Sequence, residues 1–179
     1  MRGGIHMMEI TFDQSNPNHL VETSKLIKVV SEQGKICVGA GTVMNIAQCD
    51  AAFQAGAKYF ITPNVNVDVI RKANELEVVS IPGALSPTEA AYAYEEGADF
   101  VKLFPAGDLG SNYIKSLCAP LNHIPFLAVG GVSPDNIKEF ANAGVCGFGV
   151  GGKLIDKKAI YNGEYEKITK IAQEYTNRK

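Results

Sequence analysis

The feature that most constrains the fold of this chain is a unit that recurs along it, a short apolar run followed by a longer stretch with helical periodicity. The first copy is HMMEITF, at positions 6–12, followed by positions 18–34, in which Leu20, Leu26 and Val30 lie on one apolar stripe. A strand followed by an amphipathic helix is the simplest interpretation. Alternating strands and helices with short links predict a parallel sheet covered by helices.

Six more units follow, and their boundaries carry the residue types that begin and end helices. The six begin with KICVGAG, KYFITP, VVSIPGAL, DFVKLFPA, PFLAVGG and CGFGVGG. Serine followed by proline, a pair that opens helices, stands at Ser86 and Ser133. Glycine closes four of the helical stretches, where a left-handed residue is expected: Gly34, Gly56, Gly97 and Gly144.

Seven countable units are one short of a closed eight-stranded barrel, which typically takes about 250 residues. An open doubly wound sheet competes, but it usually has fewer strands of such uniform spacing. We therefore expect an α/β fold of the TIM (β/α)8 barrel type, a single domain over residues 1–179, with the first β/α unit missing. The deficit falls at the start, because Arg2-Gly3-Gly4 resembles the end of a helix cut off from its strand. Either the chain is truncated, or another element closes the gap between the first and last strands.

Composition and charge favour a small-molecule ligand. The 179 residues are 46% hydrophobic with a formal net charge of −2, and both signs of charge are interspersed, so neither nucleic acid nor a membrane is expected as a partner. The four cysteines are widely spaced and include no CxxC pair, which predicts a reducing compartment and no zinc site. The N-terminal segment lacks the apolar core of a signal peptide. We expect a cytoplasmic protein without a bound metal.

One lysine stands in the middle of an apolar run, in DFVKLFPA. Alternate residues of a barrel strand point inward, so Lys102 would face the lumen with Phe100 and Phe104, while Val101 and Leu103 would face the helices. The lysine also lies close to the C-terminal end of its strand, the rim where barrel enzymes keep their chemistry.

The same alternation in HMMEITF sends Glu9 to the lumen and Ile10 and Phe12 to the helix layer. A lysine desolvated among phenylalanines loses its proton readily and can form a Schiff base with a ketone. A carboxylate at the same end of the barrel can donate and accept the protons that this reaction requires. Lys102 is thus the candidate nucleophile and Glu9 the candidate general acid/base, with a buried structural ion pair as the alternative.

Glycines gather at the predicted strand ends in GAGTV, AVGGVS and GVGGK. Because they lack side chains, they let backbone amides approach a ligand. The loops after the last two strands of a barrel are its usual phosphate-binding site. The alternative is that they only permit tight turns. Thr42 either orients a substrate carboxylate or caps the helix that begins near Asn45. The candidates for an anion site are Gly130, Gly131, Gly151 and Gly152.

The chain resembles the 2-keto-3-deoxy-6-phosphogluconate (KDPG) aldolase / 4-hydroxy-2-oxoglutarate (KHG) aldolase family from Gly3 to about Leu154. The resemblance rests on six segments in the family's order: GGIHMMEIT, GAGTV, ITPN, SIPGALSPTEA, FVKLFPA and AVGGVSPDN. It implies a class I aldolase that needs no metal and no cofactor. Such an enzyme is usually a homotrimer and reversibly cleaves a 2-keto-4-hydroxy acid to pyruvate and an aldehyde such as glyceraldehyde 3-phosphate or glyoxylate.

The resemblance also implies roles for single residues. Lys102 resembles the family's Schiff-base lysine, and Glu9 resembles its general acid/base. The glycines of VGGVS, with the GVGG segment, resemble the family's residues that bind the substrate phosphate. Three residues resemble those that line the pyruvate pocket: Thr42, Pro63 and Phe104.

This chain departs from the family pattern at three places. Asp13 stands where the family often carries an arginine near the substrate carboxylate, which removes an anion partner. Lys153 replaces a serine common after the final glycine pair, and the family's first strand and helix are absent. Two other functions stay open on the residues alone: a phosphosugar isomerase or synthase that uses Lys102 only electrostatically, and a binding module or inactive fragment.

Overall fold

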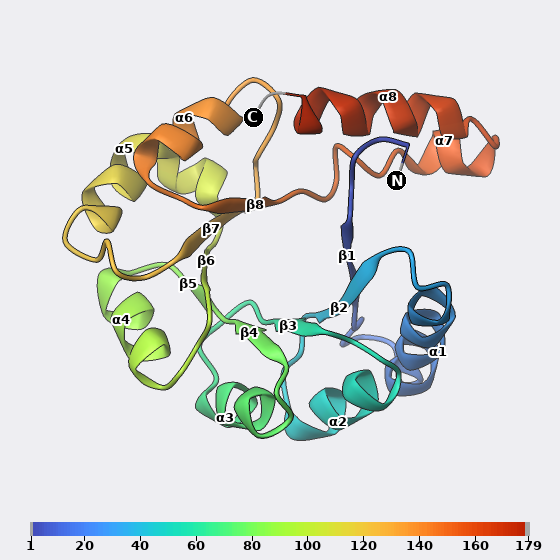
Figure 1. Ribbon diagram of the computed structural model, residues 1–179, viewed down its shortest axis with the longest axis horizontal. Helices are drawn as coiled ribbons and strands as arrows, with labels where there is room; N and C mark the ends of the chain where they lie inside the picture. Colours follow the sequence, from blue (N-terminus) through green and yellow to red (C-terminus); the bar gives the residue numbers. More distant parts are fainter. Residues whose placement is uncertain (1, 178–179) are drawn as a thin grey trace. The chain divides into compact units, whose positions relative to one another are not determined.

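The structure is a computed structural model that describes residues 2–177, and it is an α/β fold of parallel strands and helices (Figure 1). It divides into two compact units, residues 6–102 and residues 103–177 with 2–5. The strands belong to two four-stranded sheets, of order β1-β2-β3-β4 and β5-β6-β7-β8. All seven predicted strand segments are present, because β4 and β5 both come from VVSIPGAL. No helix within residues 2–177 is long and apolar enough to cross a membrane.

The unit of residues 6–102 holds the first sheet and its helices. The strands β1 to β4 pair in parallel, and Glu9 of β1 lies opposite Gly39 of β2. Figure 1 shows α1, α2 and α3 along one side of this sheet. The elements are β1 (Met7–Thr11), α1 (His19–Glu32), β2 (Cys37–Gly41), α2 (Ile46–Gln54), β3 (Tyr59–Ile61), α3 (Val67–Glu75), β4 (Val79–Ile81), β5 (Gly83–Ala84) and α4 (Pro87–Glu95).

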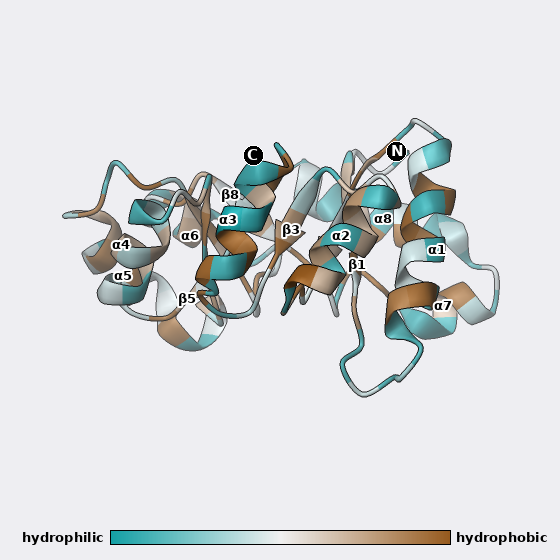
Figure 2. Cartoon of the chain, turned by 90° about the horizontal axis from the view of Figure 1, so that it is seen from below, coloured by the Kyte–Doolittle hydropathy of each residue, from teal (hydrophilic) through white to brown (hydrophobic). Residues whose placement is uncertain are grey.

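The core of this unit lies between the sheet and its helices. Ile10 packs against the buried cluster that contains Phe12 and Ile27, as the alternation in HMMEITF predicts. Phe12 is only 1% exposed, and burial of such a side chain contributes about 1.5–3 kcal/mol. Met8, which the same alternation along HMMEITF places on this face, is 42% exposed. Hydrophilic and hydrophobic stretches alternate along α1 and α3 in Figure 2, as helices with one packed face require.

Helix boundaries follow the predicted signals with two corrections. Ser86 forms a capping box with Glu89 at the start of α4, and the four helix-closing glycines have positive φ. Asn45 caps α2 through its side chain, so Thr42 is not the cap. Ser133 does not cap the helix that follows it, because its backbone N–H donates to the Asn136 side chain within a turn that precedes that helix.

The other unit begins inside β6 (Val101–Leu103). The helix after β6 starts at Ala106, bends at Gly110 (φ 76) and ends at Cys118. Its C-cap residue Ala119 still has helical backbone angles, and Pro120 lacks the backbone N–H that would extend the helical hydrogen bonding. In this unit β7 pairs in parallel with β8. The remaining elements are α5 (Ala106–Cys118), β7 (Phe126–Val129), α6 (Ile137–Ala143), β8 (Gly147–Gly149), α7 (Lys157–Tyr161) and α8 (Tyr165–Thr176).

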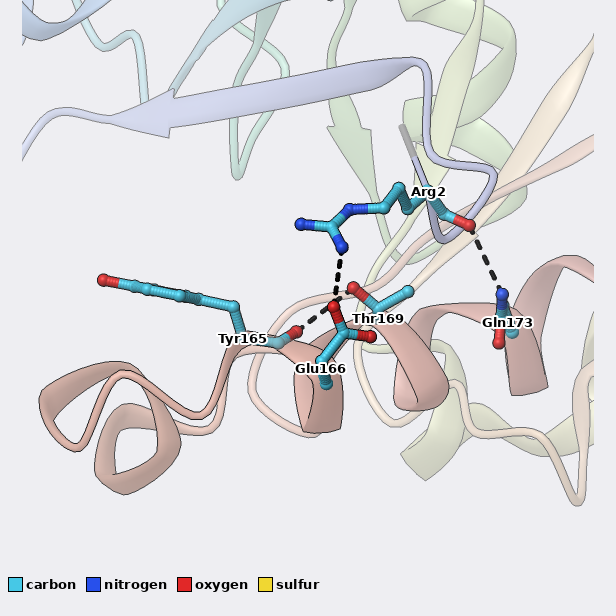
Figure 3. Close-up of polar contacts among 5 residues, drawn as sticks. All are labelled: Arg2, Tyr165, Glu166, Thr169 and Gln173. Carbon is cyan, nitrogen blue, oxygen red and sulfur yellow. Dashed lines mark hydrogen bonds and ion pairs between the residues drawn. The ribbon is translucent and has the colours of Figure 1, made fainter.

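The N-terminal residues of this unit lie against α8 (Figure 3). Arg2 pairs with Glu166 at 2.6 Å, and the Gln173 side chain donates to the Arg2 carbonyl at 3.3 Å. Thr176 donates to the Gly3 carbonyl at 2.9 Å. A side chain on Gly3 would collide with α8, so glycine is needed for this close approach.

Candidate active site

Lys102 is a buried lysine in β6. Its side chain is 8% exposed, whereas Val101 and Leu103 are fully buried and Phe104 is 39% exposed. The two aliphatic neighbours are buried, as residues that face a helix layer should be, and the direction in which Lys102 points stays a prediction. The Lys102 backbone N–H donates to the Pro82 carbonyl at 2.8 Å, which fixes the strand at this position.

The electrostatics of Lys102 favour its neutral form. Burial lowers the pKa of the ammonium below its ordinary value, and the nearby Glu9 carboxylate opposes that shift. A primary amine must be neutral to attack a carbonyl carbon. A lowered pKa therefore makes the nucleophilic form of Lys102 more abundant near neutral pH.

Glu9 lies in β1 and extends over the next strand. A methyl group on Gly41 would come within 2.6 Å of the Glu9 carboxyl carbon, so the absence of a side chain there leaves room for the carboxylate. Although Glu9 as a whole residue is exposed to solvent, desolvation of its carboxyl group raises the pKa of that group, and Lys102 opposes the shift. The two groups are thus within electrostatic reach of each other, as the strand alternation predicts.

Tyr59 is a residue that sequence reasoning missed. It is 4% exposed, and its ring occupies the space that a side chain on Gly39 would need. Burial raises the pKa of its hydroxyl, with further contributions from Glu9 and Cys37. The sequence alone does not indicate this contact, because the pairing of the apolar run YFI with the glycine-rich VGAG strand is a feature of the folded sheet.

The two other predicted site residues of this unit follow strand ends. Thr42 comes directly after β2 and has a positive φ of 54°, a conformation that costs a threonine about 1–3 kcal/mol. Pro63 follows β3 and is exposed, and its carbonyl oxygen lies where a side chain on Gly83 would be. Both residues lie at the carboxyl edge of the β1–β4 sheet, beyond the strand ends.

The unit of residues 103–177 holds the predicted anion-site glycines. Gly130 and Gly131 have φ values of 85° and 74°, and the Gly107 N–H donates to the Gly130 carbonyl at 2.8 Å. A side chain on Gly130 would come within 3.1 Å of the Phe104 ring, so the structure brings these two residues together. The second pair of glycines differs, because Gly151 and Gly152 are exposed with open space around them.

The residues that depart from the family pattern have ordinary surroundings. The Asp13 carboxylate accepts from the Ser15 hydroxyl at 2.7 Å and the Ser15 N–H at 3.0 Å, and these hydrogen bonds lower its pKa. Lys153 is exposed and lines a pocket of about 380 Å³ with Ser133, Glu174 and Tyr175. Within residues 2–177, no three His, Cys, Asp or Glu side chains gather as a metal site would require.

Comparison with known proteins identifies the family. The family model of KDPG and KHG aldolases matches residues 1–171. The chain belongs to this family. A 2-dehydro-3-deoxy-6-phosphogalactonate aldolase of Escherichia coli is 41% identical to it over 121 residues, which are 67% of this chain and 59% of that protein. The chain thus spans less than two thirds of that relative's length. The family predicted from the sequence is confirmed, and its named members are aldolases, which are lyases.

Solved structures agree with this assignment. The structure of native KDPGal superposes with a TM-score of 0.85 at 33% identity, over 98% of this chain and 82% of that one. The KDPG aldolase of Legionella pneumophila, with pyruvate captured as a covalent carbinolamine intermediate, gives a TM-score of 0.83 at 26% identity, over 96% of this chain and 82% of that one. The chain therefore has the fold of these KDPG aldolases.

Proposed function

We propose that this protein is a class I aldolase that reversibly cleaves a 2-keto-4-hydroxy acid to pyruvate and an aldehyde. The observation that carries the proposal is the buried amine of Lys102, whose pKa is lowered and which lies within electrostatic reach of Glu9. Family membership supports it, as does the relative in which pyruvate forms a covalent carbinolamine. No metal and no cofactor is needed for imine chemistry.

The reaction follows from these two groups. The neutral Lys102 amine attacks the C2 ketone and forms a carbinolamine, and protonated Glu9 gives a proton to the departing hydroxyl, which leaves as water. The resulting iminium withdraws electrons from C3. The Glu9 carboxylate takes the proton of the C4 hydroxyl, the C3–C4 bond breaks, and the aldehyde leaves. The remaining enamine is protonated at C3, and water then releases pyruvate and restores the amine.

The electrostatics suit both roles of Glu9. A carboxyl group with a raised pKa holds its proton closer to neutral pH, where it can donate during dehydration and accept during bond cleavage. Glycine at position 41 leaves room for that side chain. We assign Thr42, Pro63 and Phe104 to the pocket that surrounds the pyruvate moiety.

The distal part of the substrate would lie at the glycine loops. We assign a substrate phosphate to the backbone amides near Gly130, Gly131, Gly151 and Gly152. The positive φ values of the first pair support a backbone approach that only glycine permits. Asp13 places a carboxylate where the family often has an arginine that would pair with an anion, and Lys153 adds a positive point charge. Both residues would therefore affect which keto acid is preferred.

We further propose that residues 1–179 belong to one barrel domain of the TIM type and that the protein is a homotrimer in the cytoplasm. The seven strand segments and the likeness to solved KDPG aldolases support the barrel. Light scattering after size exclusion measures the mass of the assembly, and a monomer at working concentration would contradict the trimer.

A substrate panel tests the proposed activity. The purified chain is assayed for pyruvate release from 2-dehydro-3-deoxy-6-phosphogluconate, its galactonate-derived isomer and 4-hydroxy-2-oxoglutarate, beside Lys102→Met. We expect release from at least one acid by the unaltered chain and none from the variant. No release from any acid, by protein that is folded by circular dichroism, would contradict the proposal.

A further inference from the structure

A buried glutamine in the first turn of α2 has no part in the mechanism above. Gln48 is fully buried, yet its side chain carries an amide with several hydrogen-bonding positions. A buried amide is costly unless it is hydrogen-bonded, so its partners show what it holds in place.

The partners of Gln48 come from two different loops and from the start of α1. Its Oε1 accepts from the backbone N–H of Met44, in the loop after β2. Its Nε2 lies 3.0 Å from Oε1 of Gln14, in the loop after β1, and 3.2 Å from Nε2 of His19, the first residue of α1. One amide therefore joins the loops that follow two neighbouring strands.

The direction of each hydrogen bond is fixed by backbone groups. Because the Met44 N–H can only donate, Gln48 Oε1 is the acceptor and Gln48 Nε2 must donate to both other partners. His19 Nε2 then accepts, and His19 Nδ1 donates to the Asn16 carbonyl at 2.9 Å. Gln14 accepts through its oxygen, which leaves its Nε2 to donate to the Thr42 carbonyl at 2.9 Å.

These hydrogen bonds converge on the strained segment from Thr42 to Met44. Thr42 has a φ of 54°, which a threonine adopts only where its surroundings enforce it. Its carbonyl is held by Gln14, and the Met44 N–H by Gln48. The Met44 carbonyl accepts from the Asn66 side chain at 3.1 Å, which ties the loop after β3 to the same segment.

We propose that Gln48 is a positioning residue that holds Thr42 in the conformation needed to contact the substrate. This inference rests on the proposed function, in which Thr42 lines the pyruvate pocket. Gln48 touches no substrate itself. It acts through the backbone of residues 42–44, directly at Met44 and through Gln14 at Thr42.

Two substitutions and a matched control test the proposal. Gln48→Met keeps the length of the side chain and removes every hydrogen bond of the amide. Gln14→Met, at an exposed position, removes the link to Thr42 and the hydrogen bond that Gln48 Nε2 donates to Gln14, but it keeps the hydrogen bond between Gln48 and the Met44 N–H. Gln54→Met makes the same change at an exposed position of the same helix and serves as the control.

Hydrogen exchange measured by mass spectrometry gives a readout that does not depend on activity. In Gln48→Met we expect peptides covering residues 42–45 to exchange at least about tenfold faster, because the Met44 N–H loses its acceptor. Peptides from β3 should exchange as in the unaltered chain. Unchanged exchange at 42–45 in a folded Gln48→Met protein would overturn the proposal, whether or not the chain is an aldolase.

Kinetics test the link to the substrate. We expect the KM for the keto acid to rise about tenfold in Gln48→Met and less in Gln14→Met, with kcat changed by less than about threefold, because the reacting groups are untouched. Gln54→Met should match the unaltered chain. Equal falls in kcat in both variants with KM unchanged would overturn the positioning role, while absence of an imine in the unaltered chain would overturn the proposed function alone.

Discussion

Glu9 and Lys102 each oppose the pKa shift that burial imposes on the other. Burial raises the pKa of the carboxyl group and lowers that of the ammonium, and the attraction between the two charged forms acts against both shifts. The balance keeps a proton donor and an amine nucleophile available over the same pH range. This relationship is the physical basis of the imine chemistry proposed for the chain.

The pH dependence of imine formation depends on this pair. Because the Glu9 carboxylate raises the pKa of Lys102, Glu9→Gln should lower that pKa further. The amine is then neutral at a lower pH, so the rising limb of imine formation with pyruvate moves in the acidic direction. Rates of reductive trapping measured against pH report this limb. A limb that moves to higher pH, or one that moves equally in the exposed control Glu95→Gln, would contradict the pairing.

Loss of the Glu9 carboxyl should separate cleavage from imine formation. In Glu9→Gln we expect the rate of pyruvate release to fall by about 10²- to 10⁴-fold, the usual contribution of a general acid/base. Pyruvate should still form an adduct on Lys102 at long reaction times, because the nucleophile remains. Steady-state assays and intact-mass spectrometry measure the two effects. A variant with nearly full activity would exclude Glu9 as the proton-transfer group.

The alternation along β6 predicts unequal costs for two neighbouring truncations. Leu103 is fully buried, so Leu103→Ala should lower the free energy of unfolding by about 2–5 kcal/mol. Phe104 is 39% exposed, so Phe104→Ala should cost only about 1 kcal/mol. Urea denaturation gives both values. Equal losses of unfolding free energy in the two variants would mean that Leu103 and Phe104 lie in similar environments.

The contact between the N-terminal residues and α8 should depend on packing more than on charge. Arg2 and Glu166 are 77% and 71% exposed, so Arg2→Ala should cost no more than about 1 kcal/mol. Gly3→Ala should cost about 1–3 kcal/mol, because the new methyl group meets Ala172 and lies 3.2 Å from the Thr169 carbonyl. Thermal unfolding compares the stability of the two variants, and a larger loss for Arg2→Ala would reverse this ranking.

Much of the fold could be predicted from local signals. The strand segments, the Ser86 cap and the helix-closing glycines depend on a few neighbouring residues, so the sequence alone indicates them. Where a boundary depends on competition between signals, prediction was weaker. The helix after β6 starts at Ala106 and continues past Gly110, where a glycine with positive φ would ordinarily end a helix.

The candidate site was predictable where it depends on strand alternation. The burial of Lys102 and its proximity to Glu9 follow from counting residues along two strands. The roles of Tyr59 and Gln48 could not be found in this way, because each depends on contacts between residues that are distant in sequence. Gln48 in particular is polar and lies in a helix, a pattern that predicts a solvated residue, yet it is fully buried.

Reductive trapping tests the central claim most directly. The full chain is treated with borohydride in the presence of pyruvate, digested and examined by mass spectrometry, beside Lys102→Met and the exposed control Lys25→Met. We predict a pyruvate-derived adduct on Lys102 in the unaltered chain and in the control, and none in Lys102→Met. A folded chain that gives no adduct on Lys102, or an adduct that persists in Lys102→Met, would contradict the account.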